Sequence, residues 1–217
     1  MSDPAALRAG PATELQLVLP SGCRPERDED LPALELPPVR ATVVARAGWV
    51  ADGGLRLRAA CVRAPSDRWA PGVEDLVLGS AGHYARSTSG ADLEAWAAGP
   101  IEQRDGAFSQ LIEARGTSAD GAPVVARGRH LLGFVDAARD AALCSLVCVE
   151  PPPGARCAKA TEDARLSGEL LPPPEPSAWI RAVIVSAEHP EAAAAGACLA
   201  FVAVAALVIA RRPRPRP

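Results

Sequence analysis

An uninterrupted apolar segment near the end of the chain constrains this protein more than any other feature. No residue from Ala192 to Ala210 is charged, and four arginines follow in residues 211–217. At a helical rise of about 1.5 Å per residue, the apolar run reaches roughly 28 Å, close to the thickness of the bilayer hydrocarbon core. Residues 191–210 are therefore predicted to form one transmembrane helix, followed by an Arg/Pro tail.

Roughly half of this segment is alanine, which contributes little to the free energy of membrane insertion. The large apolar side chains therefore provide most of the favourable free energy. The predicted membrane anchor consists of Leu199, Phe201, Val202, Val204, Leu207, Val208 and Ile209. The alternative is an alanine-rich core helix. A core helix needs a domain wrapped around it, whereas this segment is followed only by the Arg/Pro tail, and arginines suit phosphate headgroups.

The residues before the anchor, 171–190, predict a stiff proline-rich spacer and then a short amphipathic helix that starts at Ser177. An apolar stripe on this helix, together with the first arginines of the tail, predicts contact with the membrane interface. These interfacial residues are Trp179, Ile180, Val183, Ile184, Arg211 and Arg212. Packing of the same stripe against the globular domain is the alternative.

Two sequence signals conflict on which side of the membrane the globular domain faces. The first ten residues lack the basic start and apolar run of a secretory signal, which favours a tail anchor with the domain in the cytoplasm of a bacterial-type cell. The positive-inside rule favours the reverse, because acidic Glu188 and Glu191 precede the span and arginines follow it. Given the missing signal, the expectation is a single-pass inner-membrane protein with a cytoplasmic domain.

Length and composition predict one globular domain. Of 217 residues, 1–12 are expected to be disordered and 13–170 to form the domain. The formal net charge is −3, and no basic surface with interleaved aromatic residues is evident, which argues against a nucleic-acid ligand.

Hydrophobic periodicity predicts the secondary structure of this domain. Alternation predicts strands, Asp52-Gly53 marks a hairpin turn, and helical spacing marks two helices. The expected strands are 13–19, 39–50, 55–63, 107–115, 123–135 and 142–150; the expected helices are 69–84, a short piece at 92–98, and 155–166; residues 21–38 are expected to be an exposed loop. The fold class is therefore α+β, an antiparallel sheet of about six strands with two packed helices and a C-terminal transmembrane helix.

The order of strand, hairpin, helix, three-stranded meander and helix resembles the PsbP-like α/β sandwich, a layout shared with DcrB-like lipoproteins. The residues concerned are Leu15–Pro20, the helix after Val62, and the meander through Gly128–Phe134 into Cys144–Cys148. The resemblance covers about residues 13–170 and implies a non-catalytic binding or assembly role.

Cysteines provide one candidate for chemistry. Cys144, Cys148 and Cys157 have C-x3-C-x8-C spacing, and thiolates can hold zinc. Cys144 and Cys148, however, are about 13 Å apart along an extended strand, too far to share one ion or to form a disulfide with each other. Buried thiols are the favoured interpretation, and a Cys148–Cys157 disulfide, which needs an oxidising compartment, is the alternative.

His130 and a nearby cysteine are a second candidate, as a nucleophile pair. The strand register places His130 on the same face as Leu132 and Phe134, so a core histidine is the favoured interpretation. The acidic run from Glu26 to Asp30 is expected to be solvated.

The leading hypothesis is thus a membrane-tethered, non-enzymatic module that recruits a protein partner to the inner membrane, without a cofactor or an identifiable small-molecule substrate. The rival hypothesis is a membrane-anchored enzyme or redox protein that uses Cys144, Cys148 and Cys157 with His130.

Overall fold

The computed structural model describes residues 3–34, 41–66, 69, 72–136, 140–176, 178 and 181. The chain divides into two units, Met1–Pro174 and Glu175–Pro217. All helices and strands with assigned bounds belong to the first unit. No helix within the described residues is long and apolar enough to cross a membrane. The predicted transmembrane helix, the Arg/Pro tail and all the predicted interfacial residues lie outside the described residues.

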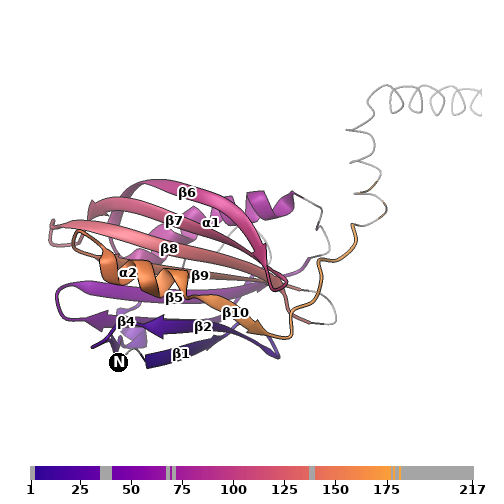
Figure 1. The fold of residues 1–217 in the computed structure, drawn as a ribbon, viewed down its shortest axis with the longest axis horizontal. Helices are drawn as coiled ribbons and strands as arrows, with labels where there is room; N and C mark the ends of the chain where they lie inside the picture. Colours follow the sequence, from indigo (N-terminus) through magenta and orange to yellow (C-terminus); the bar gives the residue numbers. More distant parts are fainter. Residues whose placement is uncertain are drawn as a thin grey trace, which may run out of the picture. The chain divides into compact units, whose positions relative to one another are not determined.

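The first unit is mostly antiparallel sheet with two α-helices (Figure 1). Its elements are β1 (Asp3–Arg8), β2 (Thr13–Leu19), β3 (Arg24–Pro25), the 3-10 helix η1 (Asp28–Asp30), β4 (Thr42–Ala51), β5 (Leu55–Ala64), α1 (Val73–Ser89), β6 (Asp92–Arg104), β7 (Ala107–Thr117), β8 (Pro123–Phe134), β9 (Ala141–Glu150), α2 (Ala155–Glu162) and β10 (Arg165–Gly168).

The strands form two sheets. The smaller has the order β1-β2-β10 and the larger the order β3-β4-β5-β9-β8-β7-β6. The predicted hairpin and the predicted meander are confirmed as β4–β5 and β7–β8–β9, and β9 is central as expected. In Figure 1, α1 lies behind the larger sheet, whereas α2 and the smaller sheet lie in front of it.

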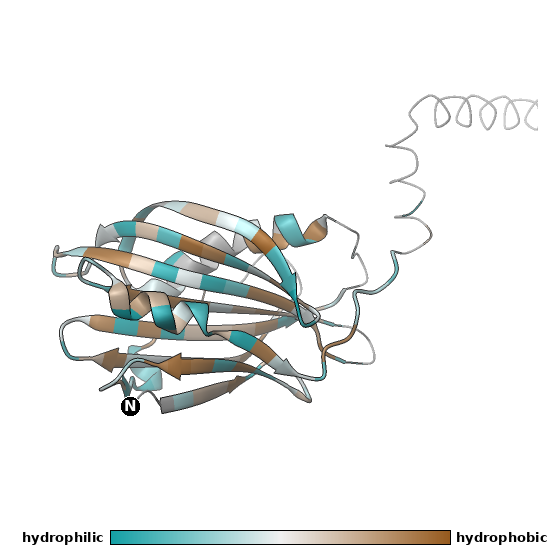
Figure 2. Ribbon diagram, in the orientation of Figure 1, coloured by the Kyte–Doolittle hydropathy of each residue, from teal (hydrophilic) through white to brown (hydrophobic). Residues whose placement is uncertain are grey.

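Hydrophobic and hydrophilic residues alternate along several strands (Figure 2), and the buried apolar residues form one layer on each face of the larger sheet. The front layer includes Leu57, Ala59 and Leu146 together with Leu15 and Leu17 of β2. The rear layer forms two clusters, one around Val62, Leu132 and Phe134 and the other around Ile112, Ala126 and Val147.

Two expectations differ from the structure near the ends of the domain. Residues 1–12 were expected to be disordered, whereas Asp3–Arg8 form β1, which pairs with β2 along its whole length. The helix expected over 155–166 ends at Glu162, and Arg165–Gly168 form β10, the other partner of β2. These short strands pair with the two edges of β2, and the alternation of β2 itself does not reveal them.

The short helix expected at 92–98 is wrong, because Asp92–Arg104 form β6. The pairing of β6 with β7 shifts in register between Leu93 and Trp96. Such an irregularity, which adds a residue to one strand, turns side chains three apart toward the same face. Both residues contact the same rear cluster, so a bulged strand imitates helical spacing.

Candidate functional site

A cavity of about 740 Å³ lies between the smaller sheet and the larger one. Its volume is within the range of ordinary ligand pockets, roughly 300–1,000 Å³. Segments far apart in the sequence form its walls. They come from β1, β2, the β6–β7 turn, β7, β8 and the chain from the end of α2 into β10. We take this pocket as the candidate functional site.

Apolar side chains form part of the wall because they belong to the layer in front of the larger sheet. They include Leu17 of β2, Leu131 of β8 and Leu166 of β10, all of which are buried. Strand alternation in β2 and β8 directs these residues toward the gap between the sheets. This part of the pocket suits an apolar group.

The main polar feature inside the pocket is Arg129 of β8, which is half-buried. Its Nη1 donates a hydrogen bond to the backbone oxygen of Glu162 at 2.6 Å, and its Nη2 donates to Oγ of Ser109 at 3.1 Å. Its Nε is buried and has no hydrogen-bond partner. Arg129 therefore caps the carboxyl end of α2 and keeps donor capacity to spare.

Burial lowers the pKa of Arg129 below its ordinary value, because a charged guanidinium is less well solvated there than in water. The negative charges of Glu102 and Glu162 raise this pKa, and the positive charge of Arg104 lowers it further. Among the described residues, none of the ion pairs within 4.0 Å involves Arg129. An anion placed beside this side chain would restore the stabilisation that burial removes.

The remaining charges of the pocket are exposed at its rim and have both signs. They are Arg104, Asp105, Glu162, Asp163 and Arg165. Nε of Arg165 donates a hydrogen bond to Oε1 of Gln16 at 3.2 Å, which links β10 to β2 beside the opening. The rim is thus polar and mixed in charge, whereas the charged side chain in the interior is a cation.

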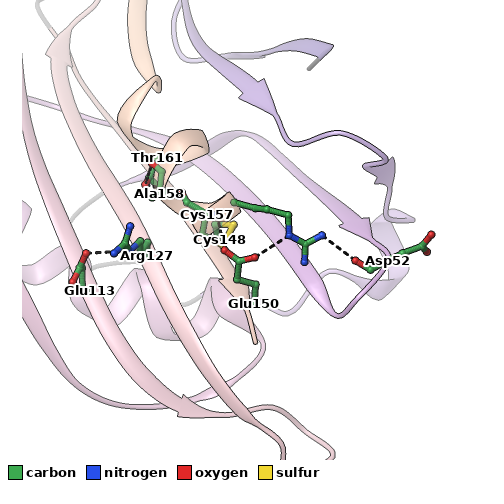
Figure 3. The surroundings of a disulfide bond; sticks show 9 residues. Asp52, Glu113, Arg127, Cys148, Glu150, Cys157, Ala158 and Thr161 are labelled. Atoms are coloured by element: carbon green, nitrogen blue, oxygen red, sulfur yellow. Dashed lines mark hydrogen bonds and ion pairs between the residues drawn. A yellow bond between two sulfur atoms is a disulfide. The ribbon is translucent and has the colours of Figure 1, made fainter. Parts of the chain in front are cut away.

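Two disulfides fix the layer that carries the pocket. Cys61 of β5 bonds to Cys144, which lies directly opposite on β9, and Cys148 of β9 bonds to Cys157 of α2 (Figure 3). The second bond ties α2 to the larger sheet. Because Arg129 caps α2 and the chain after α2 lines the pocket, this bond also holds one wall in place.

Glu150, at the end of β9, positions the start of the same helix (Figure 3). Its buried carboxylate accepts the backbone N–H of Cys157 at 2.7 Å and Nε of Arg156 at 3.0 Å. Nη1 of Arg156 also donates to the backbone oxygen of Asp52, in the β4–β5 turn. Such bonds satisfy helix N–H groups that lack an intrahelical partner.

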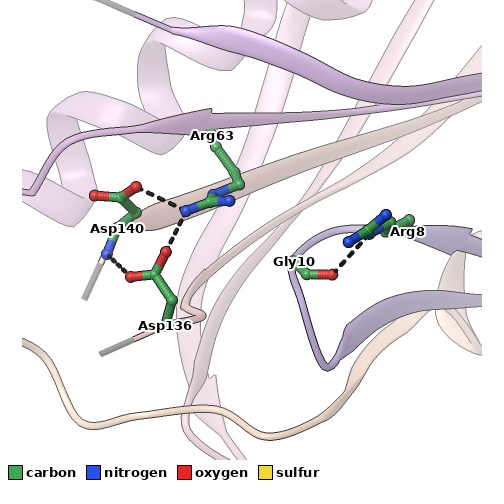
Figure 4. A network of polar contacts seen from close by, with 5 residues as sticks. All are labelled: Arg8, Gly10, Arg63, Asp136 and Asp140. Carbon is green, nitrogen blue, oxygen red and sulfur yellow. Dashed lines mark hydrogen bonds and ion pairs between the residues drawn. The ribbon is translucent and has the colours of Figure 1, made fainter. Parts of the chain in front are cut away.

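A second polar cluster joins β5 to the loop after β8 (Figure 4). Nη2 of Arg63 pairs with the carboxylates of Asp136 and Asp140, and Asp136 accepts the backbone N–H of Asp140 at 3.0 Å. Nearby, Nε of Arg8 donates to the backbone oxygen of Gly10 at 3.3 Å. All three charges of the cluster are paired, so its role is to hold the loop.

The three cysteines of the predicted group belong to two separate disulfides, so they do not form one thiol site. Cys144 pairs with Cys61, and the Cys148–Cys157 bridge is the pairing that the sequence left as an alternative. Free buried thiols at these positions, the favoured interpretation, are wrong. Cys23 is the free cysteine among the described residues, and burial raises the pKa of its thiol. Those residues contain no cluster of His, Cys, Asp or Glu suited to a metal ion.

His130 is a core residue, as the register predicted, and is fully buried. It lies opposite Ser145 on β9, so both belong to the rear face of the sheet, whereas Cys144 and Cys148 belong to the front. Neither ring nitrogen has a hydrogen-bond partner, and burial lowers the pKa of His130 to about 3. The structure therefore does not bring His130 together with the cysteines.

Sequence reasoning missed Arg129, Ser109 and the pairing of Cys61 with Cys144. One signal was present for Arg129: it alternates with Leu131 on a strand that faces the buried front layer. The pocket itself depends on β1 and β10, two strands that the sequence did not predict.

No protein-family model matches this chain, and no curated protein matches it. A similar solved structure is that of LpqN, which is involved in cell envelope biogenesis of Mycobacterium tuberculosis. The two are 12% identical with a TM-score of 0.47, over 76% of this chain and 91% of that one. The likeness to the PsbP-like group stays a prediction.

Proposed function

We propose that this chain is a membrane-tethered, non-enzymatic binding module that recruits a protein partner through the pocket between its two sheets. The observation that carries the proposal is the pocket itself, a cavity of about 740 Å³ with apolar walls and a cation inside. Disulfides and a capped helix hold its walls, and preorganised walls lower the entropic cost of binding. Residues 191–210 supply the proposed tether.

The globular domain is proposed to face an oxidising compartment, contrary to the orientation expected from the sequence. Disulfides persist in such compartments and are rare in the cytosol, and this domain contains two. The reversed orientation also leaves the arginines of residues 211–217 on the cytoplasmic side, as the positive-inside rule favours.

A pocket-filling variant tests the binding role. Ala6 is exposed and lines the pocket, so Ala6→Trp in the full-length chain would obstruct it without changing the core. Arg8→Trp on the same strand is the matched control, because Arg8 is exposed and does not line the pocket. We expect proteins that co-purify from detergent-solubilised membranes with the original chain to be lost from Ala6→Trp and kept by Arg8→Trp. Identical sets from all three chains would contradict a role for the pocket.

A thiol count tests the compartment. The chain has six cysteines. Alkylation in denaturant without a reductant should label Cys23 and Cys198 only, and four further sites should react after reduction. Labelling of all six before reduction would show that the domain matures in a reducing compartment. A reporter that is active only in the periplasm, fused to the N-terminus, provides the independent check.

A further inference from the structure

The chemistry inside the pocket narrows the kind of group that it accepts. Arg129 and the hydroxyl of Ser109 lie together there, 3.1 Å apart at their polar atoms, while the acidic lining residues are exposed at the rim. Each Nη of Arg129 carries two N–H groups and uses one of them in the bonds to Glu162 and Ser109, and guanidinium groups bind carboxylates with paired, charge-assisted hydrogen bonds. The interior therefore favours an anion.

The same interior also favours an apolar group next to the anion. Leu131 is two residues from Arg129 on β8, and alternation puts both side chains on the front face. Leu17 and Leu166 continue this apolar wall on β2 and β10. A carboxylate with an apolar side chain beside it is the chemistry of the last residue of a polypeptide.

The rim indicates that the ligand continues out of the pocket as a polar chain. Its exposed charges have both signs, and Gln16 adds an amide. Peptide groups and mixed side chains match such a rim, whereas an aliphatic ligand would need apolar surface there. A volume of about 740 Å³ also exceeds what one small acid requires.

We propose that the pocket binds the C-terminal end of a partner protein, with Arg129 and Ser109 holding the terminal carboxylate and Leu17, Leu131 and Leu166 holding the last, apolar side chain. This rests on the binding role proposed above and adds the partner's chemistry. Arg129 binds the anion, and its hydrogen bond to the end of α2 fixes the direction of the arginine side chain.

Peptides that differ only in their terminal group test the proposal. Full-length protein in nanodiscs is titrated by calorimetry with an acetylated pentapeptide, Gly-Ser-Gly-Ala-Leu, as the free acid and as the C-terminal amide. Loss of a charge-assisted bond should weaken the amide about tenfold to a hundredfold. Equal affinities of acid and amide, or no binding of either at millimolar concentration, would overturn the assignment.

Two variants locate the effect. Arg129→Gln should remove the preference for the acid, because the side chain then carries no charge. Arg127→Gln is the matched control, two residues away on the same face of β8 but paired with Glu113 and outside the pocket lining, and it should keep the preference. A preference that survives Arg129→Gln would contradict the proposal. Circular dichroism of both variants checks that the fold is retained.

A shorter probe separates a chain end from a small acid. N-acetyl-leucine presents the same carboxylate and side chain without the upstream residues, so the pentapeptide should bind more tightly. If N-acetyl-leucine binds equally well, the occupant is a small organic acid, and the assignment to a protein terminus is wrong. Failure of every peptide, while Ala6→Trp still loses its co-purified proteins, would leave the binding role intact and refute only the terminus.

Discussion

The two faces of the larger sheet are stabilised in different ways. The front face, which carries the pocket, is apolar and is crosslinked by both disulfides. The rear face, under α1, contains a row of polar residues, Gln110, His130 and Ser145, on three neighbouring strands. Each has a buried side-chain atom without a hydrogen-bond partner, and the row separates the two rear apolar clusters. The comparison indicates that the stabilising crosslinks are concentrated on the face that carries the pocket.

Removing the Cys61–Cys144 disulfide should have the largest effect. The bond joins residues separated by 83 positions, and a crosslink over such a loop contributes roughly 4 to 5 kcal/mol in the loop-entropy description. Cys61→Ala with Cys144→Ala should lower the free energy of unfolding by about that amount in urea titrations followed by tryptophan fluorescence. The Cys148–Cys157 bond spans 9 positions, so its double variant should lose only about 2.5 kcal/mol. Equal losses in the free energy of unfolding for the two double variants would show that loop length does not determine how much each disulfide stabilises the fold.

Breaking the buried ion pair at the margin of the rear face should cause the second-largest loss of stability. Arg58 holds Glu26 through two hydrogen bonds, at 2.8 and 2.9 Å, and the side chains are only 7% and 8% exposed. Glu26→Gln leaves the arginine charge buried without an anion, which costs about 3 kcal/mol or more. Urea unfolding measures the loss. The sequence assigned Glu26 to a solvated charge run, and this prediction was wrong for Glu26, although Asp28, Glu29 and Asp30 are exposed as expected.

Acid should destabilise the rear face through His130. Burial lowers its pKa in the folded state to about 3, whereas the unfolded chain has the ordinary value of 6.5. The unfolded state therefore takes up a proton first, so stability is complete above pH 6.5 and is lost as pH falls toward 3. Between pH 6.5 and 4.5 the loss should be about 2 to 3 kcal/mol. His130→Leu should lack this loss. The free energy of unfolding of the original chain and of the variant is measured as a function of pH, and parallel profiles would contradict a role for His130.

Local sequence signals predicted the parts of this fold that depend on neighbouring residues. Alternation predicted β2, β7, β8 and β9, and Asp52-Gly53 predicted the β4–β5 turn. A second signal was overlooked: Asp105-Gly106 forms the tight β6–β7 turn with positive φ at both residues, and it indicated a strand before Ala107. The pocket was not predictable in this way, since it needs β1 and β10 to pair with β2 from opposite ends of the domain. The Cys61–Cys144 bond likewise needs the pairing of β5 with β9.

The exposed ion pair on the front face should have the smallest effect. Nε of Arg127 lies 3.1 Å from Oε1 of Glu113, directly across from it on β7, and the two side chains are 30% and 60% exposed. Water already solvates such charges, so the pair contributes about 0 to 1 kcal/mol. Glu113→Gln makes the same chemical change as Glu26→Gln, and comparing their urea midpoints isolates burial as the variable. A loss for Glu113→Gln as large as that for Glu26→Gln would mean that burial does not explain the difference between the two pairs. The ion pairs could then no longer serve to compare the faces, and the disulfides alone would account for the contrast.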